Sequence, residues 1–424
     1  HPPRLQAPPA PKNKKLLFQE VTGANWHLRR ESSGGVLIVN GSKIIELNES
    51  AYRYVKTYMK IKTRDKRMPL AMFFRHGVWP GRAKRDWQSL KDTLVTTSHG
   101  CCTGTGIHVE VGKKEYAAPI RVDLALTYRC NNDCYHCYAG GNHETEELNT
   151  TQWKAAIDKL WQFGVPQVAF TGGESLLRDD LEELVSYAKK LGMITGLITN
   201  GRLLTKTRVN KLEAAGLDFV QITVESHEEK VHDQMVMCEG AYKETIGGVK
   251  AALTSLLRVT TNTTMTSLNS ATILDTVDFL LDLGVKHIGL NGLIRSNRGK
   301  DKEGLTGQEL QVILQSAKER CNAVGAELIW FTPTCYLAFN PLKERLGTKR
   351  CSAASTVLAI EPFGRIIPCQ SYFEGLGNIK TDSLEDAWEH PLAVSIRDRK
   401  WLEEPCFNCA HNLACGGACP LECK

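Results

Sequence analysis

The chain has 424 residues, more than one ordinary domain holds, and its 42% hydrophobic and 24% charged residues are typical of globular proteins. This composition excludes a disordered or collagen-like chain, and no run of 18 apolar residues predicts a membrane span. The net charge of +6 is unevenly placed, because residues 1–120 carry a balance of +12 and the remainder a balance of −6. The basic front indicates either an acidic partner or a solvated basic face.

Cysteine is unusually frequent. The chain holds 15 cysteines, an odd number, and no apolar signal-peptide core follows His1. These features argue against a disulfide framework and for a reduced compartment with thiolate-bound metal. We therefore expect a cytoplasmic protein.

The front of the chain, residues 15–100, is expected to be a small module of strands followed by helices. Asn40-Gly41 is a strong hairpin signal, and Asn48-Glu49-Ser50 starts a helix that runs through Tyr58. Residues 101–119, rich in Gly and Thr, are the expected linker. The expected strands are residues 26–30, 35–40 and 42–47, and two further helices are expected at residues 70–74 and 87–94.

The middle of the chain repeats one unit, in which a helical stretch ends in Gly and a short apolar run follows. Thr150 or Thr151 is the expected cap of the first of these helices. Alternating helices and strands predict a parallel sheet with outer helices, either a partial barrel or an open doubly wound sheet. In both, ligands lie at the carboxyl ends of the strands. Strands are expected near residues 121, 167, 194, 218, 257 and 287, with a possible seventh near 327.

A CxxxCxxC motif, Cys130, Cys134 and Cys137, directly follows the first of these strands. Three thiolates on one loop can hold three irons of a [4Fe–4S] cluster and leave the fourth iron open to a small molecule. The alternative is a zinc site that lacks one ligand, but structural zinc sites usually have four.

Polar motifs end the next strands at the same edge of the sheet. Paired glycines after the second strand allow a ligand to lie against the backbone, and the Glu that follows can pair with an ammonium group. Ordinary strand polarity is the alternative for the residues of the fourth strand. The motifs are Thr171-Gly172-Gly173-Glu174, Thr199-Asn200-Gly201, and the alternating Gln221, Thr223 and Glu225.

Together, these residues resemble the radical S-adenosylmethionine (SAM) enzymes. The resemblance implies that residues 120–332 form a partial (β/α)6 barrel, an α/β fold, and that Cys130, Cys134 and Cys137 bind three irons while SAM chelates the fourth. It places Gly172, Gly173 and Asn200 at the SAM site. Glu174 would contact the methionine amino group, the backbone at His136 the adenine, and Thr223 and Glu225 the ribose, with weaker assignments for Asn262 and Thr264.

The tail, residues 333–424, has little hydrophobic periodicity, so we expect metal to fold it. Its cysteine spacing resembles the SPASM extension, an iron–sulfur domain of radical SAM maturases. That resemblance implies two auxiliary clusters, with Cys335 as an eighth ligand or else an open iron. A zinc ribbon of Cys406, Cys409, Cys415 and Cys419 is the alternative. The implied cluster ligands are Cys406, Cys409, Cys415 and Cys423 for one cluster and Cys351, Cys369 and Cys419 for the other.

The front module resembles the PqqD-like domain, a small winged-helix-like fold that grips the leader of a precursor peptide. The carrying residues are Gly35–Val39 and Ile44–Ala51. Such domains add a peptide strand to a sheet edge. A basic winged-helix nucleic-acid binder competes, but the sequence lacks a recognition helix of interleaved basic and aromatic residues.

The resemblances imply a radical SAM oxidoreductase that uses a 5′-deoxyadenosyl radical to modify a ribosomally made peptide, forming a thioether or C–C cross-link. They imply about three [4Fe–4S] clusters and a reductant such as flavodoxin or ferredoxin, and no membrane or nucleic-acid partner. The alternatives are an oxidative decarboxylase of a tetrapyrrole side chain and a non-catalytic iron–sulfur electron carrier. No catalytic acid or base is assigned, and Cys101 and Cys102 have no predicted role.

Overall fold

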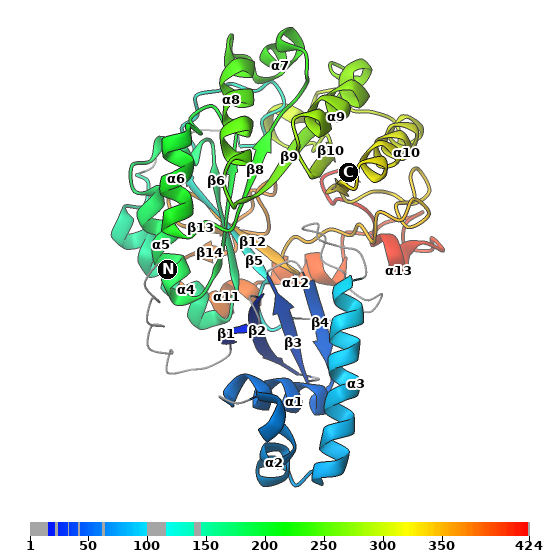
Figure 1. Cartoon of the computed structure of the whole chain (residues 1–424). Helices are drawn as coiled ribbons and strands as arrows, with labels where there is room; N and C mark the ends of the chain where they lie inside the picture. Colours follow the sequence, from blue (N-terminus) through cyan, green and yellow to red (C-terminus); the bar gives the residue numbers. More distant parts are fainter. Residues whose placement is uncertain are drawn as a thin grey trace. The chain divides into compact units, whose positions relative to one another are not determined.

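The computed structural model describes residues 16–21, 24–32, 34–40, 43–61, 64–99, 116–139 and 146–422. These residues belong to two compact units, residues 16–99 and residues 116–422 (Figure 1). Cys101, Cys102 and Cys423 lie outside the described residues, as does most of the predicted linker. Within the described ranges, no helix is both long and apolar enough to cross a membrane.

The first unit begins with a four-stranded antiparallel sheet in the order β1-β2-β3-β4. The three predicted strands are confirmed as β2 to β4, and β1 is a strand that the sequence analysis missed. Of the six residues of β1, only the first and the last are buried, so its sequence lacks the alternation of apolar and polar residues that predicts a strand. The strands are β1 (Leu16–Val21), β2 (Ala24–Glu31), β3 (Gly34–Val39) and β4 (Lys43–Leu47).

Three helices follow this sheet. The predicted start of the first is confirmed, because the Asn48 side chain accepts a hydrogen bond from the Ala51 N–H at 2.9 Å. The other two helices are longer than predicted. Proline normally ends or kinks a helix, yet the second helix contains Pro69 in its interior. The helices are α1 (Glu49–Lys60), α2 (Arg64–His76) and α3 (Pro80–His99).

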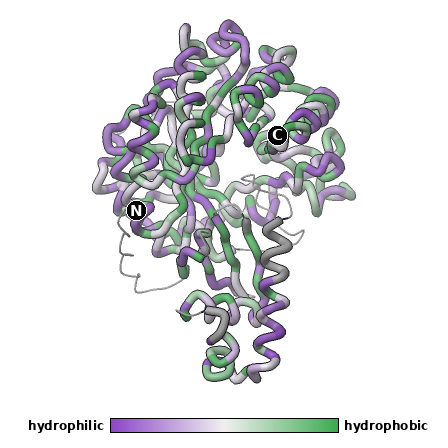
Figure 2. The backbone as a smooth tube through the Cα atoms, in the orientation of Figure 1, coloured by the Kyte–Doolittle hydropathy of each residue, from purple (hydrophilic) through white to green (hydrophobic). Residues whose placement is uncertain are grey.

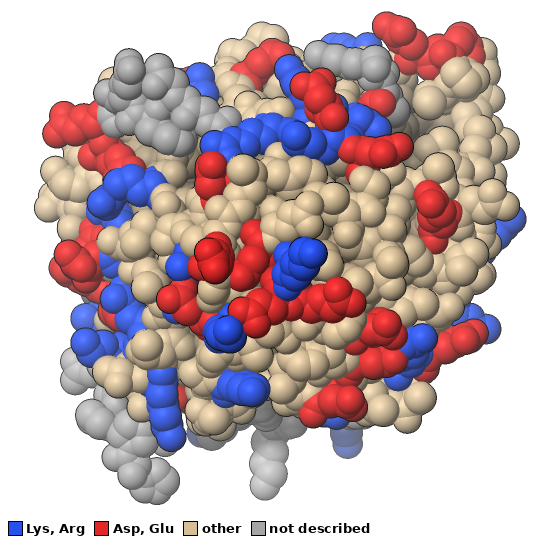
Figure 3. Space-filling view, turned by 90° about the horizontal axis from the view of Figure 1, so that it is seen from above, with Lys and Arg blue, Asp and Glu red and all other residues tan. Residues whose placement is uncertain are grey.

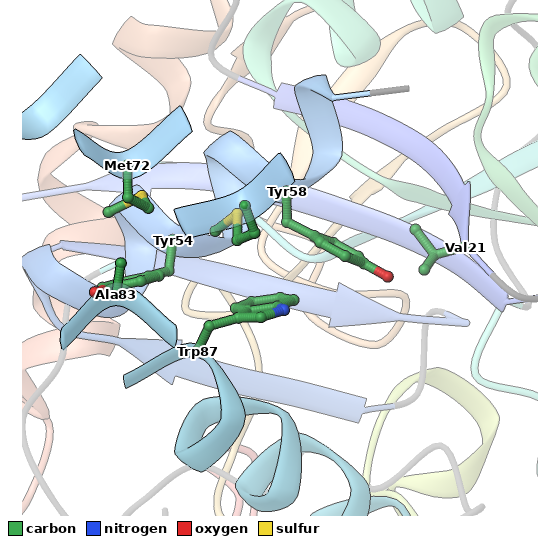
Figure 4. Packing of buried hydrophobic residues seen from close by; sticks show 7 residues of the cluster. Val21, Tyr54, Tyr58, Met72, Ala83 and Trp87 are labelled. Carbon is green, nitrogen blue, oxygen red and sulfur yellow. The ribbon is translucent and has the colours of Figure 1, made fainter. Parts of the chain in front are cut away.

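The first unit has a core of its own, in which the three helices meet the sheet (Figure 4). Tyr58 of α1 and Trp87 of α3 are buried with ring centroids 4.5 Å apart, and Met72 of α2 packs in the same cluster. The buried Tyr54 also donates its hydroxyl hydrogen to Asp86 at 3.0 Å. Burial of these large side chains stabilises the unit independently of the rest of the chain.

A ten-stranded sheet forms the centre of the second unit, in the order β11-β10-β9-β8-β7-β6-β5-β12-β13-β14. Strands β5 to β11 are parallel, and each lies beside the next one in the chain. All seven predicted strands are confirmed. Their order never reverses, so the sheet is a partial barrel and not doubly wound. The strands are β5 (Arg121–Thr127), β6 (Gln167–Gly172), β7 (Ile194–Thr199), β8 (Phe219–Thr223), β9 (Arg258–Met265), β10 (His287–Gly292) and β11 (Glu327–Trp330).

Amphipathic helices connect these strands, with green and purple alternating along them in Figure 2. Asn149, not Thr150 or Thr151, caps α4, because its side chain accepts from the Gln152 N–H at 3.0 Å in a reciprocal capping box. Gly164, with φ of 103°, ends the same helix in the left-handed conformation that glycine favours. The helices are α4 (Thr150–Phe163), α5 (Leu181–Leu191), α6 (Lys206–Ala215), α7 (Glu229–Val236), α8 (Ala241–Leu253), α9 (Ile273–Asp282) and α10 (Gly307–Ala323).

Positive and negative side chains are mixed on the face of the molecule that Figure 3 shows. Lys and Arg side chains are interspersed with Asp and Glu side chains on that face, and no large patch has one sign. Pairs such as Arg208 with Glu182, at 2.8 Å, join neighbouring helices.

The first half of the tail continues the barrel sheet. β12 (Val357–Ile360) pairs in parallel with β5, all four of its residues are buried, and β13 (Arg365–Ile367) and β14 (Gly377–Asn378) follow it. Apolar burial against β5 therefore holds part of this half, and the expectation that metal folds the tail stays a prediction. Beyond residue 400 the described chain is mostly turns. The tail helices are α11 (Leu384–Trp388), α12 (Pro391–Asp398) and α13 (Asn412–Cys415).

Candidate active site

The predicted cysteine loop lies at the carboxyl end of β5, and neighbouring segments hold it in place. Its backbone N–H groups at Asp133 and Tyr135 donate to the carbonyls of Val236 and Met235 at 3.0 and 3.1 Å. Arg298, from the loop after β10, donates to the carbonyl of Asp133 at 2.9 Å and to its carboxylate. The loop shape is thus set by elements far along the chain.

The three thiols of this loop crowd one another in a partly buried place. Burial raises the pKa of Cys134 well above its usual value, and the neighbouring Cys137 and Glu225 raise it further. Burial likewise raises the pKa of Cys130. Only a cation at the thiols would make all three thiolates stable together, because thiolates repel one another and metal binding requires deprotonation.

This donor set suits an iron–sulfur cluster, because it consists of three cysteines and each cysteine of such a cluster binds a different iron. Structural zinc sites usually have four ligands. Within the described parts of the chain, no three His, Cys, Asp or Glu side chains form a site for a single metal ion.

Gly172 and Gly173 bring the end of β6 against the cysteine loop. A Cβ on Gly172, where φ is +139°, would lie 2.1 Å from the Thr127 carbonyl oxygen, and one on Gly173 would lie 2.4 Å from that of Arg129. The sequence analysis expected these glycines to make room for a ligand. Both line the cavity described below, but the contact that requires glycine is with the chain's own backbone.

Glu174 lies behind this wall and does not line the cavity. Its fully buried carboxylate accepts from the Thr199 hydroxyl at 2.8 Å and from the N–H groups of Asn200 and Leu176 at 2.8 and 2.9 Å. Burial raises its pKa, against these hydrogen bonds, which lower it. Glu174 therefore fixes the turn after β7, and its predicted contact with the SAM amino group stays a prediction.

The turn after β7 is joined in turn to the cysteine loop. The Asn200 side-chain amide donates to Asn131 at 2.7 Å, and Asn200 faces the cavity. Arg202 donates to Asn132 at 2.9 Å. Hydrogen bonds through Asn200 thus connect the buried Glu174 to the cysteine loop.

Strands β8 and β9 supply the opposite wall. Glu225, just past β8, accepts from the Thr264 N–H at 2.8 Å, and its other oxygen lies 3.1 Å from the His136 ring. The sequence analysis did not foresee that His136 would be held by its side chain. Asn262 is buried, and its Oδ1 has no hydrogen-bond partner among the described residues, although it borders the cavity. An unpaired buried acceptor of this kind indicates a ligand with a hydrogen to donate.

These walls enclose one cavity of about 590 Å³, within the range of sites for cofactor-sized ligands. The described residues therefore fit SAM beside a cluster. The sequence analysis missed the residues that β10, β11 and the tail contribute, because none of them belongs to a local motif. The cavity lining includes the predicted Cys130, Cys134, Cys137, His136, Gly172, Gly173, Asn200, Gln221, Thr223, Glu225, Asn262 and Thr264, and the unpredicted Tyr138, Asn291, Arg298, Phe331, Gln370 and Ser371.

The described cysteines of the tail lie in two neighbourhoods. Burial raises the pKa of Cys351 to about 12, and the nearby Cys369 raises it further. Cys351 and Cys369 in turn raise the pKa of Cys419. Cys406, whose pKa is also raised by burial, lies near Cys335, Cys415 and Cys409. Gln370 and Ser371, which follow Cys369, reach the cavity of the barrel.

Comparison with known families decides what kind of protein carries this site. A model of the radical SAM superfamily matches residues 124–291, and a model of the SPASM iron–sulfur cluster-binding domain matches residues 351–410. The chain therefore carries a radical SAM domain followed by a SPASM domain. The predicted radical SAM and SPASM domains and the partial barrel are therefore confirmed, and the electron-carrier alternative is wrong.

Two relatives of the chain differ in their named activities. The chain is 28% identical over 322 residues to the PqqA peptide cyclase of Bradyrhizobium diazoefficiens, an alignment that covers 72% of this chain and 83% of the relative. It is 25% identical over 317 residues to the AdoMet-dependent heme synthase of Methanosarcina barkeri, covering 71% of this chain and 91% of the relative.

Among solved structures, the fold is similar to that of Streptococcus suis SuiB bound to its precursor peptide SuiA. The TM-score is 0.69 at 18% identity, and the alignment covers 92% of this chain and 93% of SuiB. The structure of anSMEcpe with bound AdoMet and the Cp18Cys peptide is similar over 71% of this chain and 89% of that protein, with a TM-score of 0.57 at 16% identity. These similarities establish the fold.

Proposed function

We propose that this radical SAM enzyme oxidatively modifies a ribosomally made precursor peptide, by a thioether or C–C cross-link. The observation that carries the proposal is a cavity with the cysteine loop on one wall and Gln370 and Ser371, from the tail, on another. A substrate held there lies between the SAM site and the Cys369 neighbourhood. Oxidation needs an electron acceptor near the substrate, and an auxiliary cluster at Cys369 would supply one.

In this proposal, Cys130, Cys134 and Cys137 hold the SAM-binding [4Fe–4S] cluster. When bound, this cluster and SAM supply a 5′-deoxyadenosyl radical that removes a hydrogen atom from the substrate. The chain's own residues position the ligand. Asn200, Thr223 and Glu225 line its cavity, His136 is oriented by Glu225, and a flavodoxin or ferredoxin is the proposed reductant.

The other two clusters of the proposed three belong to the tail. The cysteines proposed to bind them follow β11, precede β12, follow β13 or lie after residue 400, where Cys415 ends α13. They are Cys335, Cys351, Cys369, Cys406, Cys409, Cys415, Cys419 and Cys423, of which Cys423 lies outside the described residues.

The first unit is proposed to be a PqqD-like module that binds the peptide leader. Its sheet has β1 and β4 at its edges within the described residues, and a leader strand could pair with such an edge. Residues 1–120 carry a charge balance of +12, which suits an acidic leader. Exposed cations on or beside this sheet include Arg30 and Arg53, each paired with Glu49.

Binding of the leader by this module can be measured directly. Fluorescence anisotropy of the full chain with a labelled leader should show affinity that falls with salt without vanishing, since main-chain pairing is not screened. Labelled duplex DNA is the control for the nucleic-acid alternative. Tight DNA binding without leader binding would overturn the assignment of this module.

The tetrapyrrole alternative is supported by the heme synthase relative, and the same assay can test it. The enzyme, reconstituted anaerobically with iron and sulfide, is incubated with SAM, with reduced flavodoxin or ferredoxin as the electron donor, and with either a short peptide encoded beside its gene or a porphyrin precursor. We expect the peptide to lose mass by two hydrogens per cross-link and the porphyrin precursor to remain unchanged. Loss of carbon dioxide from the porphyrin precursor, with an unchanged peptide, would favour the alternative.

A further inference from the structure

Two charged residues lie on the inner face of β5, although the buried strands of a parallel sheet are normally apolar. Alternation along the strand puts Arg121, Asp123 and Ala125 on one face. Ala125 pairs with Thr171, which lines the cavity, so this face points into the barrel. Arg121 itself lines the cavity, from the end of β5 that is opposite to the cysteine loop.

Asp123 fixes the Arg121 guanidinium in place. The side chain of Asp123 is buried, and its two carboxylate oxygens lie 2.8 Å from Nε and 3.3 Å from Nη2 of Arg121. The third nitrogen, Nη1, makes no hydrogen bond to a described residue. Because the guanidinium presents its five N–H donors in one fixed plane, the edge that faces away from Asp123 can bind a ligand.

An ion pair inside the barrel is costly, because both charges lose their water, and an apolar pair of similar size is often at least as stable. The pair therefore indicates a task beyond stability. The acidic residues that line the cavity are engaged at its other end, Asp133 with Arg298 and Glu225 with His136. Among the described residues, Arg121 is paired with no carboxylate other than that of Asp123.

We propose that Arg121 binds a carboxylate of the substrate, by the two parallel hydrogen bonds that guanidinium and carboxylate groups form. The seven residues of β5 separate this site from the cysteine loop by about 20 Å, so the carboxylate holds the substrate in place and is not the group that reacts. In a peptide, an acidic side chain or the C-terminus supplies this carboxylate, and in a porphyrin precursor an acidic side chain of the ring does. The inference rests on the proposed function in that the substrate reacts in this cavity.

The test combines a change in the enzyme with a change in the substrate. The full chain, reconstituted as above, is given SAM, reduced flavodoxin and the peptide encoded beside its gene, or versions of this peptide in which one carboxylate at a time is converted to the amide. Arg121→Gln should raise KM for the unchanged peptide about tenfold to a hundredfold and change kcat much less, because a charge-assisted hydrogen bond remote from the reacting atom is lost. One amide peptide should show the same rise with the unmodified enzyme. For that peptide, Arg121→Gln should add no further rise, as expected for two groups that contact each other.

Arg258→Gln is the matched control. Arg258 also begins a strand, β9, and lies 3.7 Å from a carboxylate, that of Glu327, but it does not line the cavity. It should leave KM unchanged, whereas Arg121→Lys, which keeps the charge and loses the planar fork, should recover part of the affinity. Circular dichroism and iron content show whether each variant folds. If Arg121→Gln alone does not fold, the double variant Arg121→Gln, Asp123→Asn replaces it, because it leaves no unpaired charge.

A KM that Arg121→Gln leaves unchanged would overturn the inference. A rise of the same size for every amide peptide would also overturn it, since Arg121 would then be structural. If only the porphyrin precursor reacts, the proposed peptide function fails, and the inference holds only where Arg121→Gln raises the KM of the free acid and not that of its methyl ester. If the unmodified enzyme changes neither substrate, the proposed function and this inference both fail.

Discussion

The barrel and the end of the tail both present cysteines for iron, but the two regions hold them in different ways. In the barrel, the loop of Cys130 to Cys137 follows a strand of a buried parallel sheet, and hydrogen bonds from distant segments hold it in place. Beyond residue 400, turns and the four-residue helix α13 carry the cysteines. We therefore expect the barrel site to be largely built before metal binds, and we expect residues 401–422 to depend on metal for much of their order.

Replacing Cys130, Cys134 and Cys137 together by Ala should have the largest effect. SAM cleavage should be abolished and about four irons lost, while the thermal unfolding temperature falls little, because the sheet does not depend on the cluster. The measurements are 5′-deoxyadenosine formation, iron content and circular dichroism, with Cys321→Ala as the control. Global unfolding of the triple variant would show that the barrel, too, depends on its metal.

Removal of iron from the whole chain should separate the two regions. When a chelator removes the iron at pH 8 without denaturant, the thiols of Cys406 and Cys409 should become open to alkylation, whereas Cys321 should not react. Burial raises the pKa of Cys321 to about 12, so only about one thiol in ten thousand is ionised at that pH. Hydrogen exchange should rise in residues 401–422 and stay slow in β12. Equal labelling of Cys321 would contradict this difference.

Glu174→Gln should weaken SAM binding without loss of iron. The carboxylate accepts several hydrogen bonds in a buried place, and a charge-assisted hydrogen bond is worth about 1.5–3 kcal/mol, so affinity should fall on the order of tenfold to a hundredfold. Thr199→Val is the matched variant, because it removes a partner of Glu174 and keeps the charge. If Glu174 acts by positioning Asn200, both variants weaken binding in calorimetry. If Glu174 contacts SAM directly, Glu174→Gln lowers the affinity for SAM far more than Thr199→Val does.

Gln370→Ala should have a smaller effect, confined to the substrate. The Gln370 amide nitrogen is buried at the cavity and has no partner among the described residues, so it suits a peptide carbonyl. A neutral hydrogen bond is worth about 0.5–1.5 kcal/mol, which predicts about a twofold to tenfold rise in KM. SAM cleavage without substrate should be unchanged. An unchanged KM and kcat would exclude this contact.

Much of the barrel could be predicted because its signals are local. Five of the barrel helices end at or next to a Gly before an apolar run, and CxxxCxxC and Gly-Gly-Glu follow strands directly, so the sequence alone places Cys130 and Gly172 at one sheet edge. Contacts between distant segments carry no such signal. Three features depend on the completed fold. They are the hydrogen bond from Asn200 to Asn131, the position of Gln370 at the cavity and the pairing of β12 with β5.

The errors have similar physical causes. The sequence analysis judged β12 by its surroundings, where apolar periodicity is weak, although four buried residues suffice when the strand joins an existing sheet. A second reason for glycine at the end of β6, the close approach of Thr127 and Arg129, cannot be seen in sequence either.

The most direct test of the account follows hydrogen atoms from the peptide to the cofactor. A precursor peptide deuterated at the modified residue is incubated with the anaerobically reconstituted enzyme, SAM and reductant, and 5′-deoxyadenosine is analysed by mass spectrometry. The account predicts 5′-deoxyadenosine carrying one deuterium, in step with the mass change of the peptide. Unlabelled 5′-deoxyadenosine beside a fully modified, uniformly deuterated peptide would contradict the claim that the barrel cavity is where the peptide reacts.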